Sequence, residues 1–207
     1  MGFRHTFLSA ATAYADTVGK AASVSWDGPG LGEWTVAELI GHATGSGLGC
    51  VPTVLRMPAE QRSIATPEDY FALAKSVPPE MLAAARAAST ELGRRDATAL
   101  GDDPGAAVRA MATAAEAALA EVSDDDVVES AAGGMRVVDW LPTRTFELVV
   151  HGLDISAATG IAFEPSDAAL ADVTALAARL VVAVGDGAVV LRALTGRGAL
   201  PAGFAVG

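Results

Sequence analysis

The chain of 207 residues is long enough for one domain with a sizeable core, or for one domain and a small appendage. Hydrophobic residues make up 51% of it and charged residues 19%, a balance that excludes a disordered chain. The net charge of -11 argues against nucleic acid or an anionic membrane as a partner, because both bind cationic surfaces. A single cysteine, Cys50, predicts no internal disulfide and a reducing, cytoplasmic environment. The sequence contains no apolar run that is long enough to predict a membrane-spanning segment.

Two helices are predicted in the first quarter of the chain. The first covers residues 3–22, and its inward face comprises Phe7, Leu8, Ala11, Tyr14, Ala15 and Val18. After a loop rich in glycine and proline, Thr35 and Glu38 have the spacing of a capping box and predict the start of a second helix. The inward face of this helix comprises Val36, Leu39, Ile40 and Ala43. His42 lies at the edge of that face, a position that is more often a core or rim residue than a ligand.

Three glycines follow His42 at alternate positions: Gly45, Gly47 and Gly49. Each weakens a helix by about 1 kcal/mol relative to alanine, and the missing side chains are expected to leave space beside His42. No strand precedes them, so they are not a dinucleotide-binding fingerprint. Cys50 lies about 12 Å along a helix from His42, too far to share a metal ion with it, and is predicted to be a core residue.

The middle of the chain predicts helices joined by short connections. Residues 51–76 are expected to form a lid or connector, and helices are predicted over 78–95 and 104–122 with a turn over GRRDATALGDDPG between them. The acidic segment 123–139 is predicted to be irregular, with a short extended piece over Val127, Val128, Val137 and Val138. Its run of Asp124 to Asp126 lacks the spacing of a calcium loop and is expected to be solvated.

A central helix is predicted over 140–160, and Ser166 is expected to cap another helix that reaches about residue 184, followed by a shorter one over 188–194. Helices dominate and strands are almost absent. The fold class is therefore predicted to be all-α. We expect a helical bundle over 1–160 and a short, mainly helical C-terminal extension over 161–207 that packs on it.

One stripe of the predicted central helix holds all of its charged residues: Trp140, Arg144, Glu147, His151 and Asp154 follow one another there at steps of four, three, four and three. The other faces are apolar or small, which is typical of a buried helix whose polar groups face an internal site. Buried charges are costly unless they pair with one another or bind a metal. The alternative is a solvated face with Arg144–Glu147 and His151–Asp154 ion pairs.

Glu147 and His151 form an E-x-x-x-H pair that could offer a carboxylate oxygen and an imidazole nitrogen to one ion, and His42 would supply the third ligand. Three protein ligands leave positions open for water or substrate, as in catalytic metal sites. Zinc is favoured by two imidazoles and a carboxylate, and nickel, cobalt or Fe(II) would also fit. Taken alone, E-x-x-x-H is a weak signal, because chance copies on helices are common.

Three segments together resemble one family. They are WTVAELIGH at 34–42, RTFELVVHGLDI with ATG at 144–160, and LTGRGALPAGF at 194–204. They are similar to the mycothiol-dependent maleylpyruvate isomerase family of the DinB-like superfamily. The resemblance implies a four-helix bundle with a divalent metal held by His42, Glu147 and His151. It also implies that the metal binds and activates the thiol of a low-molecular-weight cofactor, typically mycothiol.

The expected function is S-transfer to, or isomerisation of, a small electrophile. Arg144 and Arg197 are the candidates to hold a substrate carboxylate, although an ion pair with Glu147 or Asp154 would equally explain Arg144. Asp154 is expected to orient a ligand rather than to be one.

The thiol cofactor is expected beside Gly45, Gly49 and Trp34, although tryptophans at such positions are more often packing residues. The alternatives are hydrolysis by a metal-bound water and a non-catalytic bundle that binds metal or small molecules. A homodimer is compatible with all of them.

Overall fold

In a computed structural model, residues 2–205 are described, except for the side chains of residues 74–76 and 79. The described chain is mostly helical, which confirms the predicted all-α class. Its helices are α1 (Phe3–Ala21), α2 (Val36–Thr44), α3 (Val51–Val54), α4 (Pro67–Ser76), α5 (Pro79–Ala99), α6 (Pro104–Ala120), α7 (Val137–Thr159), α8 (Asp167–Ala183) and α9 (Gly187–Leu194). A π-helical turn, η1 (Gly45–Gly49), joins α2 to α3. None of the described helices is long and apolar enough to cross a membrane.

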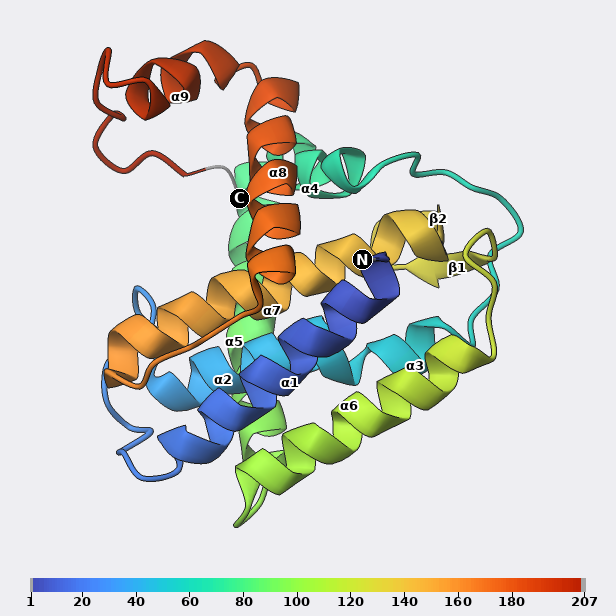
Figure 1. The fold of residues 1–207 in the computed structure, drawn as a ribbon, viewed down its shortest axis with the longest axis vertical. Helices are drawn as coiled ribbons and strands as arrows, with labels where there is room; N and C mark the ends of the chain where they lie inside the picture. Colours follow the sequence, from blue (N-terminus) through green and yellow to red (C-terminus); the bar gives the residue numbers. More distant parts are fainter. Residues whose placement is uncertain (1, 206–207) are drawn as a thin grey trace.

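The bundle is built around α1, which packs against both α6 and α7, while α2 packs against α7 (Figure 1). Its interior is apolar and includes Phe7, Tyr14, Leu39, Leu148 and Ile155, all fully buried. The hydroxyl of Tyr14 donates to the Ile40 carbonyl at 3.0 Å and lies 2.9 Å from the Thr44 hydroxyl, so it ties α1 to α2. The inward face predicted for residues 3–22 is therefore the face that meets the core.

The predicted capping box at the start of α2 is confirmed. The Thr35 hydroxyl accepts from the Glu38 amide at 3.2 Å, and the Glu38 carboxylate accepts from the Thr35 amide at 2.8 Å. Glu38 also pairs with Arg94 of α5 at 2.6 Å. These bonds satisfy amides that the first helical turn cannot satisfy itself, and they fix where α2 begins.

The turn predicted over GRRDATALGDDPG is confirmed only for residues 100–103 and is wrong for its first half, because α5 continues through Gly93 as far as Ala99. The glycine marks a helix crossing instead of a helix end. A Cβ atom on Gly41 of α2 would lie 1.9 Å from the Gly93 carbonyl oxygen, and one on Gly93 would lie 2.7 Å from the Glu38 carbonyl oxygen. The two glycines therefore let α2 and α5 approach backbone to backbone.

The region 51–76, predicted as a lid or connector, contains α3 and α4. At the start of α4 the Thr66 hydroxyl accepts from the Asp69 amide at 3.1 Å, and Pro67 occupies the first turn. A threonine cap followed by proline is a helix-start signal that the sequence analysis did not use. Helix α4 packs against α7 and α8, and Glu68 pairs with Arg179 of α8.

The acidic segment before α7 forms an antiparallel hairpin of β1 (Val127–Ser130) and β2 (Gly133–Arg136). The extended structure predicted at Val127 and Val128 is confirmed. For Val137 and Val138 it is wrong, because both belong to the first turn of α7. Arg136 directly precedes this turn, and its Nε donates to the Asp139 carboxylate three residues later at 2.8 Å, which favours the helical start.

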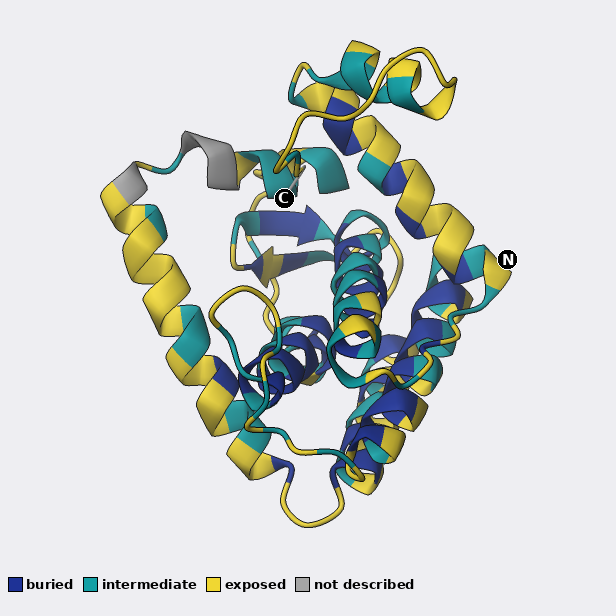
Figure 2. Cartoon of the chain, turned by 90° about the vertical axis from the view of Figure 1, so that its left-hand side faces the viewer, coloured by how far each residue is buried: buried dark blue, intermediate teal, exposed yellow. Residues whose placement is uncertain are grey.

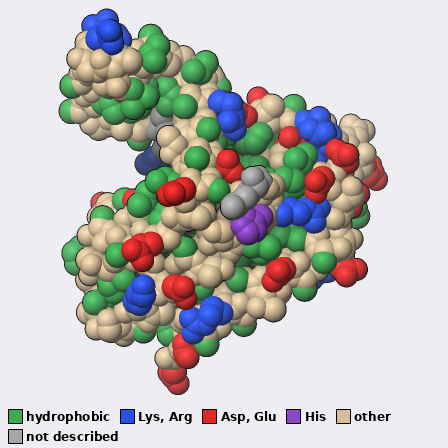
Figure 3. Space-filling model, viewed as in Figure 1, with side chains coloured by type: hydrophobic (Ala, Val, Ile, Leu, Met, Phe, Trp, Pro, Cys, Tyr) green, Lys and Arg blue, Asp and Glu red, His purple; other side chains and the backbone are tan. Residues whose placement is uncertain are grey.

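The C-terminal segment packs on the bundle through α8. The predicted cap is confirmed, since the Ser166 hydroxyl accepts from the Ala169 amide at 3.3 Å. Helix α8 contacts α7, α1 and α4, whereas α9 contacts α8 at its far end (Figure 1). No residue of α9 is buried, and hydrophobic side chains are exposed on the part of the molecule that α9 forms (Figure 3). The division into 1–160 and 161–207 stays a prediction.

Candidate metal centre

Helix α7 carries most of the predicted site. It runs from Val137 to Thr159, so it begins three residues before the predicted start at Trp140. It ends at Gly160, whose left-handed backbone (φ 73°) suits glycine. Pro142 lies in the second turn of the helix, where it cannot donate a backbone hydrogen bond.

The charged stripe of α7 is neither fully buried nor a solvated face. Trp140 and Arg144 are 2% and 5% exposed, and the side chains of Glu147, His151 and Asp154 are partly buried. Leu153 is 46% exposed, so the expectation of a helix surrounded by protein is wrong for this part of α7. Exposed positions lie mainly on the outer faces of the helices, and buried positions lie towards the middle of the molecule (Figure 2). The stripe thus passes from the bundle interior towards solvent, which suits a site that a small molecule must reach.

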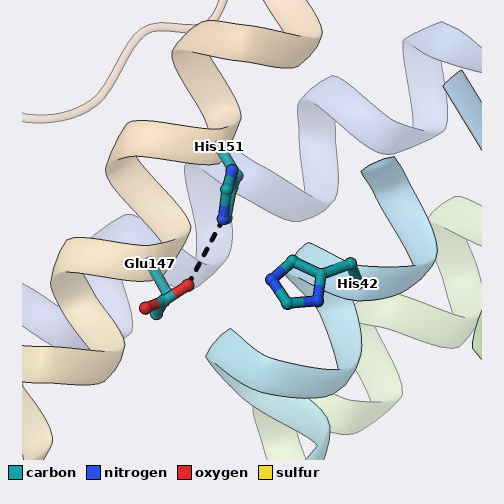
Figure 4. Close-up of side chains that lie close together, drawn as sticks. All are labelled: His42, Glu147 and His151. Atoms are coloured by element: carbon teal, nitrogen blue, oxygen red, sulfur yellow. Dashed lines mark ion pairs between the residues drawn. The ribbon is translucent and has the colours of Figure 1, made fainter. Parts of the chain in front are cut away.

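His42, Glu147 and His151 converge, although they come from two helices far apart in the sequence (Figure 4). One ligand atom from each lies within 4.8 Å of the others. The Glu147 Oε2 and His151 Nε2 atoms are 3.3 Å apart. Two ligands of a tetrahedral zinc ion, each about 2.0–2.1 Å from the metal, lie roughly 3.4 Å from one another. The pair on α7 therefore has the separation that a metal needs, and one carboxylate with two imidazoles is a donor set that fits a divalent ion.

Asp154 contacts His151 on the side away from Glu147, as expected of a residue that orients a ligand. The Asp154 Oδ2 atom lies 3.0 Å from His151 Nδ1. A carboxylate on one imidazole nitrogen directs the other nitrogen towards a metal and raises its basicity. The role of Asp154 in ligation stays a prediction.

Without a metal, Glu147 and His151 form an ion pair. Burial lowers the pKa of His151, but hydrogen bonds to Asp154 and Glu147 outweigh it and raise the pKa to about 9. Burial raises the pKa of Glu147, whereas the hydrogen bond from His151 and the charge of Arg144 lower it, and the net direction is down. A carboxylate and an imidazolium therefore face each other where a metal would take the place of the Nε2 proton.

His42 is held by a tryptophan. The rings of Trp34 and His42 have centroids 4.8 Å apart at an angle of 49°, and Trp34 Nε1 donates to the Thr90 hydroxyl at 2.7 Å. Burial and the positive charge of His151 lower the pKa of His42, which keeps this imidazole neutral and able to bind a cation. Trp34 thus packs against a candidate ligand, and its predicted role in binding the cofactor stays a prediction.

Arg144 makes no ion pair with Glu147 or Asp154 among the described residues, because both carboxylates pair with His151. The alternative that such a pair explains Arg144 is therefore wrong. Its Nη1 donates to the Ser46 carbonyl of η1 at 2.7 Å, and its Nε donates to the Thr143 hydroxyl at 3.0 Å. The guanidinium links α7 to the turn that follows His42.

Arg197 is not brought together with these residues. It lies beyond α9, is exposed, and donates to the nearby Thr195 carbonyl at 3.0 Å. Helix α9 contacts α8, not the helices that carry the histidines (Figure 1). The structure therefore gives no support to a shared role of Arg144 and Arg197.

The glycines after His42 do not leave open space beside it. A Cβ atom on Gly45 would lie 2.2 Å from Asp96 Oδ2, and one on Gly47 would lie 2.8 Å from Leu148 Cδ2. At Gly45 and Gly47 the space that a side chain would take is filled by α5 and α7, so the expectation is wrong for these two glycines. Gly45 and Gly49 line a cavity of about 360 Å³, together with Thr44, Cys50, Arg95, Asp96, Ala99 and Met111. Their role in cofactor binding stays a prediction.

Tyr70 is the site residue that the sequence analysis missed. It comes from α4, and its ring lies 5.1 Å from the guanidinium carbon of Arg144. The neighbouring Phe71 packs on Phe146 of α7, with ring centroids 4.9 Å apart. The helix-start signal at Thr66 and Pro67 could have placed a helix here, but nothing in the sequence pairs Tyr70 with Arg144. Cys50 packs against the core, as predicted.

Comparison with protein families gives a match over most of the chain. The family described as Mycothiol maleylpyruvate isomerase N-terminal domain matches residues 7–156, which include most of α1, all of α2 and the part of α7 that carries the candidate ligands. Comparison with curated proteins and with solved structures finds no match.

Proposed function

Because the chain belongs to the mycothiol maleylpyruvate isomerase N-terminal domain family, we propose that it is a metal-dependent enzyme that uses a low-molecular-weight thiol. The thiol, mycothiol or a similar molecule, is transferred to a small electrophile or assists its isomerisation. The proposal rests on one observation, the convergence of His42, Glu147 and His151 to within 4.8 Å. Zinc is the favoured ion for this donor set, and nickel, cobalt or iron could replace it.

Each residue of the centre has a defined task in this proposal. His42, Glu147 and His151 would hold the ion and leave coordination positions open for the thiol. The ion would lower the pKa of a coordinated thiol and so supply a nucleophile near neutral pH. Asp154 fixes the His151 ring through Nδ1, and Trp34 fixes the ring of His42. Both histidines are thereby held with one nitrogen directed into the space between α2 and α7 (Figure 4).

We expect the purified protein to bind about one divalent ion per chain. In chelator-treated protein, zinc at 100 times its dissociation constant should raise the melting temperature by roughly 5–10 °C, because it binds the native state. His42→Ala should abolish this shift. His5→Ala is the matched control, since His5 is exposed on α1, and it should leave the shift unchanged. Absence of metal from protein never exposed to chelator, with no response to zinc, would contradict the site.

Cobalt substitution tests the thiol directly. A thiolate bound to cobalt adds a charge-transfer band that water-bound cobalt lacks, so mycothiol should produce this band in the cobalt protein. The band should be absent in His42→Ala and present in His5→Ala. A cobalt protein whose spectrum does not respond to mycothiol or to simpler thiols would favour hydrolysis or a non-catalytic role instead.

A further inference from the structure

Arg144 is a buried cation that lacks a carboxylate partner among the described residues. It is 5% exposed, and its Nη2 atom has no hydrogen-bond partner in the described part of the chain. The carboxylates that share its stripe on α7, those of Glu147 and Asp154, form their ion pairs with His151. Removing a guanidinium from water without pairing it costs several kcal/mol, so this arrangement needs a reason.

The contacts of Arg144 leave one nitrogen of its guanidinium, Nη2, free to bind an anion. Nη1 and Nε are directed at Ser46 and Thr143, while Tyr70 and Trp140 lie over the guanidinium at 5.1 and 5.8 Å. The Cys50 thiol also lies within hydrogen-bond reach of Arg144, and burial raises its pKa, so it stays neutral. Backbone, hydroxyl, thiol and ring contacts therefore position the guanidinium but add no negative charge. The free Nη2 is therefore the atom to which an anion can bind, and a planar guanidinium favours a carboxylate.

Tyr70 supplies a second group that suits an anion. Burial raises the pKa of its phenol, so the hydroxyl stays protonated and neutral and can act as a donor. Tyr70 belongs to α4, which Glu68 and Arg179 attach to α8. Because Arg144 is almost inaccessible, a carboxylate can reach Nη2 only when a covering side chain moves aside, and Tyr70 is one of the two side chains that lie over the guanidinium.

The position of Arg144 along α7 places its guanidinium next to the candidate metal centre. Arg144 precedes Glu147 by three residues, about one helical turn, and its charge lowers the pKa of the Glu147 carboxylate. An anion held by Arg144 would thus lie beside the candidate ligands. It would also be covered by α4, away from the exposed end of the charged stripe.

We propose that Arg144 and Tyr70 form a carboxylate-binding site beside the three candidate ligands. The carboxylate belongs to one of the two molecules that react there, the electrophile or the thiol, and in this respect the inference rests on the proposed function. The site itself does not depend on a metal. It can therefore be tested in chelator-treated protein with acetate as the probe.

The first experiment measures acetate binding at constant ionic strength by calorimetry, and by the side-chain Nε–H resonances of ¹⁵N-arginine-labelled protein. Acetate should bind saturably and shift the Arg144 resonance, whereas chloride should not. Arg144→Lys should weaken binding at least about tenfold, because lysine keeps the charge but lacks the fork. Arg86→Lys is the matched control on an exposed arginine of α5 and should bind as wild type.

Tyr70→Phe keeps Arg144 and the ring that lies over its guanidinium, so it tests the site even if Arg144→Lys fails to fold. It should weaken acetate binding about fivefold, the equivalent of one hydrogen bond of about 1 kcal/mol. If acetate does not bind saturably, or if both variants bind it as wild type does, the proposal is overturned. Water alone would then occupy the space at Nη2.

The second experiment identifies the molecule that carries the carboxylate. In zinc-loaded protein, N-acetylcysteine is compared with its amide, and in metal-free protein acrylate and acrylamide compete with acetate. Tighter binding of N-acetylcysteine than of its amide assigns the carboxylate to the thiol. Equal binding of the two thiols, with displacement by acrylate and not acrylamide, assigns it to the electrophile. If neither pair differs, the site is not a carboxylate site. Acetate binding in a protein that fails to bind zinc would contradict the proposed function and leave this site standing.

Discussion

Replacing Glu147 by glutamine should lower zinc affinity more than about 100-fold, since even residues that only orient a ligand account for 10–100-fold. Glutamine keeps the shape of the side chain and removes the negative charge, so it separates ligation from packing. The measurement is zinc affinity by competition with a coloured chelator. Glu116→Gln is the matched control, because Glu116 is exposed on α6 and should keep wild-type affinity.

Glu147→His provides the opposite comparison. Imidazole is also a good zinc ligand, so this variant should keep much of the affinity that the glutamine variant loses. In chelator-treated protein the stability of the two variants should not follow their zinc affinity, because without metal Glu147 only pairs with His151 at 3.3 Å. Both variants should be less stable than wild type there, since each removes one partner of a partly buried pair. Equal zinc affinity in wild type and Glu147→Gln would rule out Glu147 as a ligand.

The spacing of polar residues predicted much of the candidate site. Steps of three and four on a helix place Glu147, His151 and Asp154 on one face whatever the tertiary structure, and their contacts follow that order. His42 was added from another predicted helix, and the family resemblance strengthened this assignment, because contact between α2 and α7 depends on how the bundle packs. The structure brings His42 to within reach of both α7 residues.

Features that depend on the approach of two helices were not predictable from local patterns. Gly93 was expected to belong to a turn that follows the helix over 78–95, but it lies inside α5, at the crossing with α2. Gly45 and Gly47 were expected to leave space beside His42, but the side chains of Asp96 and Leu148 occupy the space next to them. In each case the sequence shows a missing side chain, and only the partner element decides whether the space stays open.

The same crossing leads to the second large effect, which is the loss of stability expected for Gly41→Ala. The added Cβ atom would lie 1.9 Å from the Gly93 carbonyl oxygen and 2.7 Å from the Ala97 amide nitrogen. Both are backbone atoms, so no side chain can rotate away and α2 must separate from α5. Overpacking costs 1–3 kcal/mol in most cores, and we expect about 3 kcal/mol here. Urea unfolding of chelator-treated protein measures this change without a contribution from bound metal.

Gly49→Ala is the control for Gly41→Ala, because its Cβ atom would meet ordinary contacts at 3.4 and 4.0 Å. It should unfold at the same urea concentration as wild type or at a slightly higher one, since alanine favours helical structure over glycine. Gly93→Ala should be intermediate, because its closest contact, the Glu38 carbonyl oxygen, would lie at 2.7 Å instead of 1.9 Å. A loss below about 1 kcal/mol for Gly41→Ala would mean that the helices separate easily. His42 follows Gly41 directly, so a tight crossing also fixes where this candidate ligand stands relative to α7.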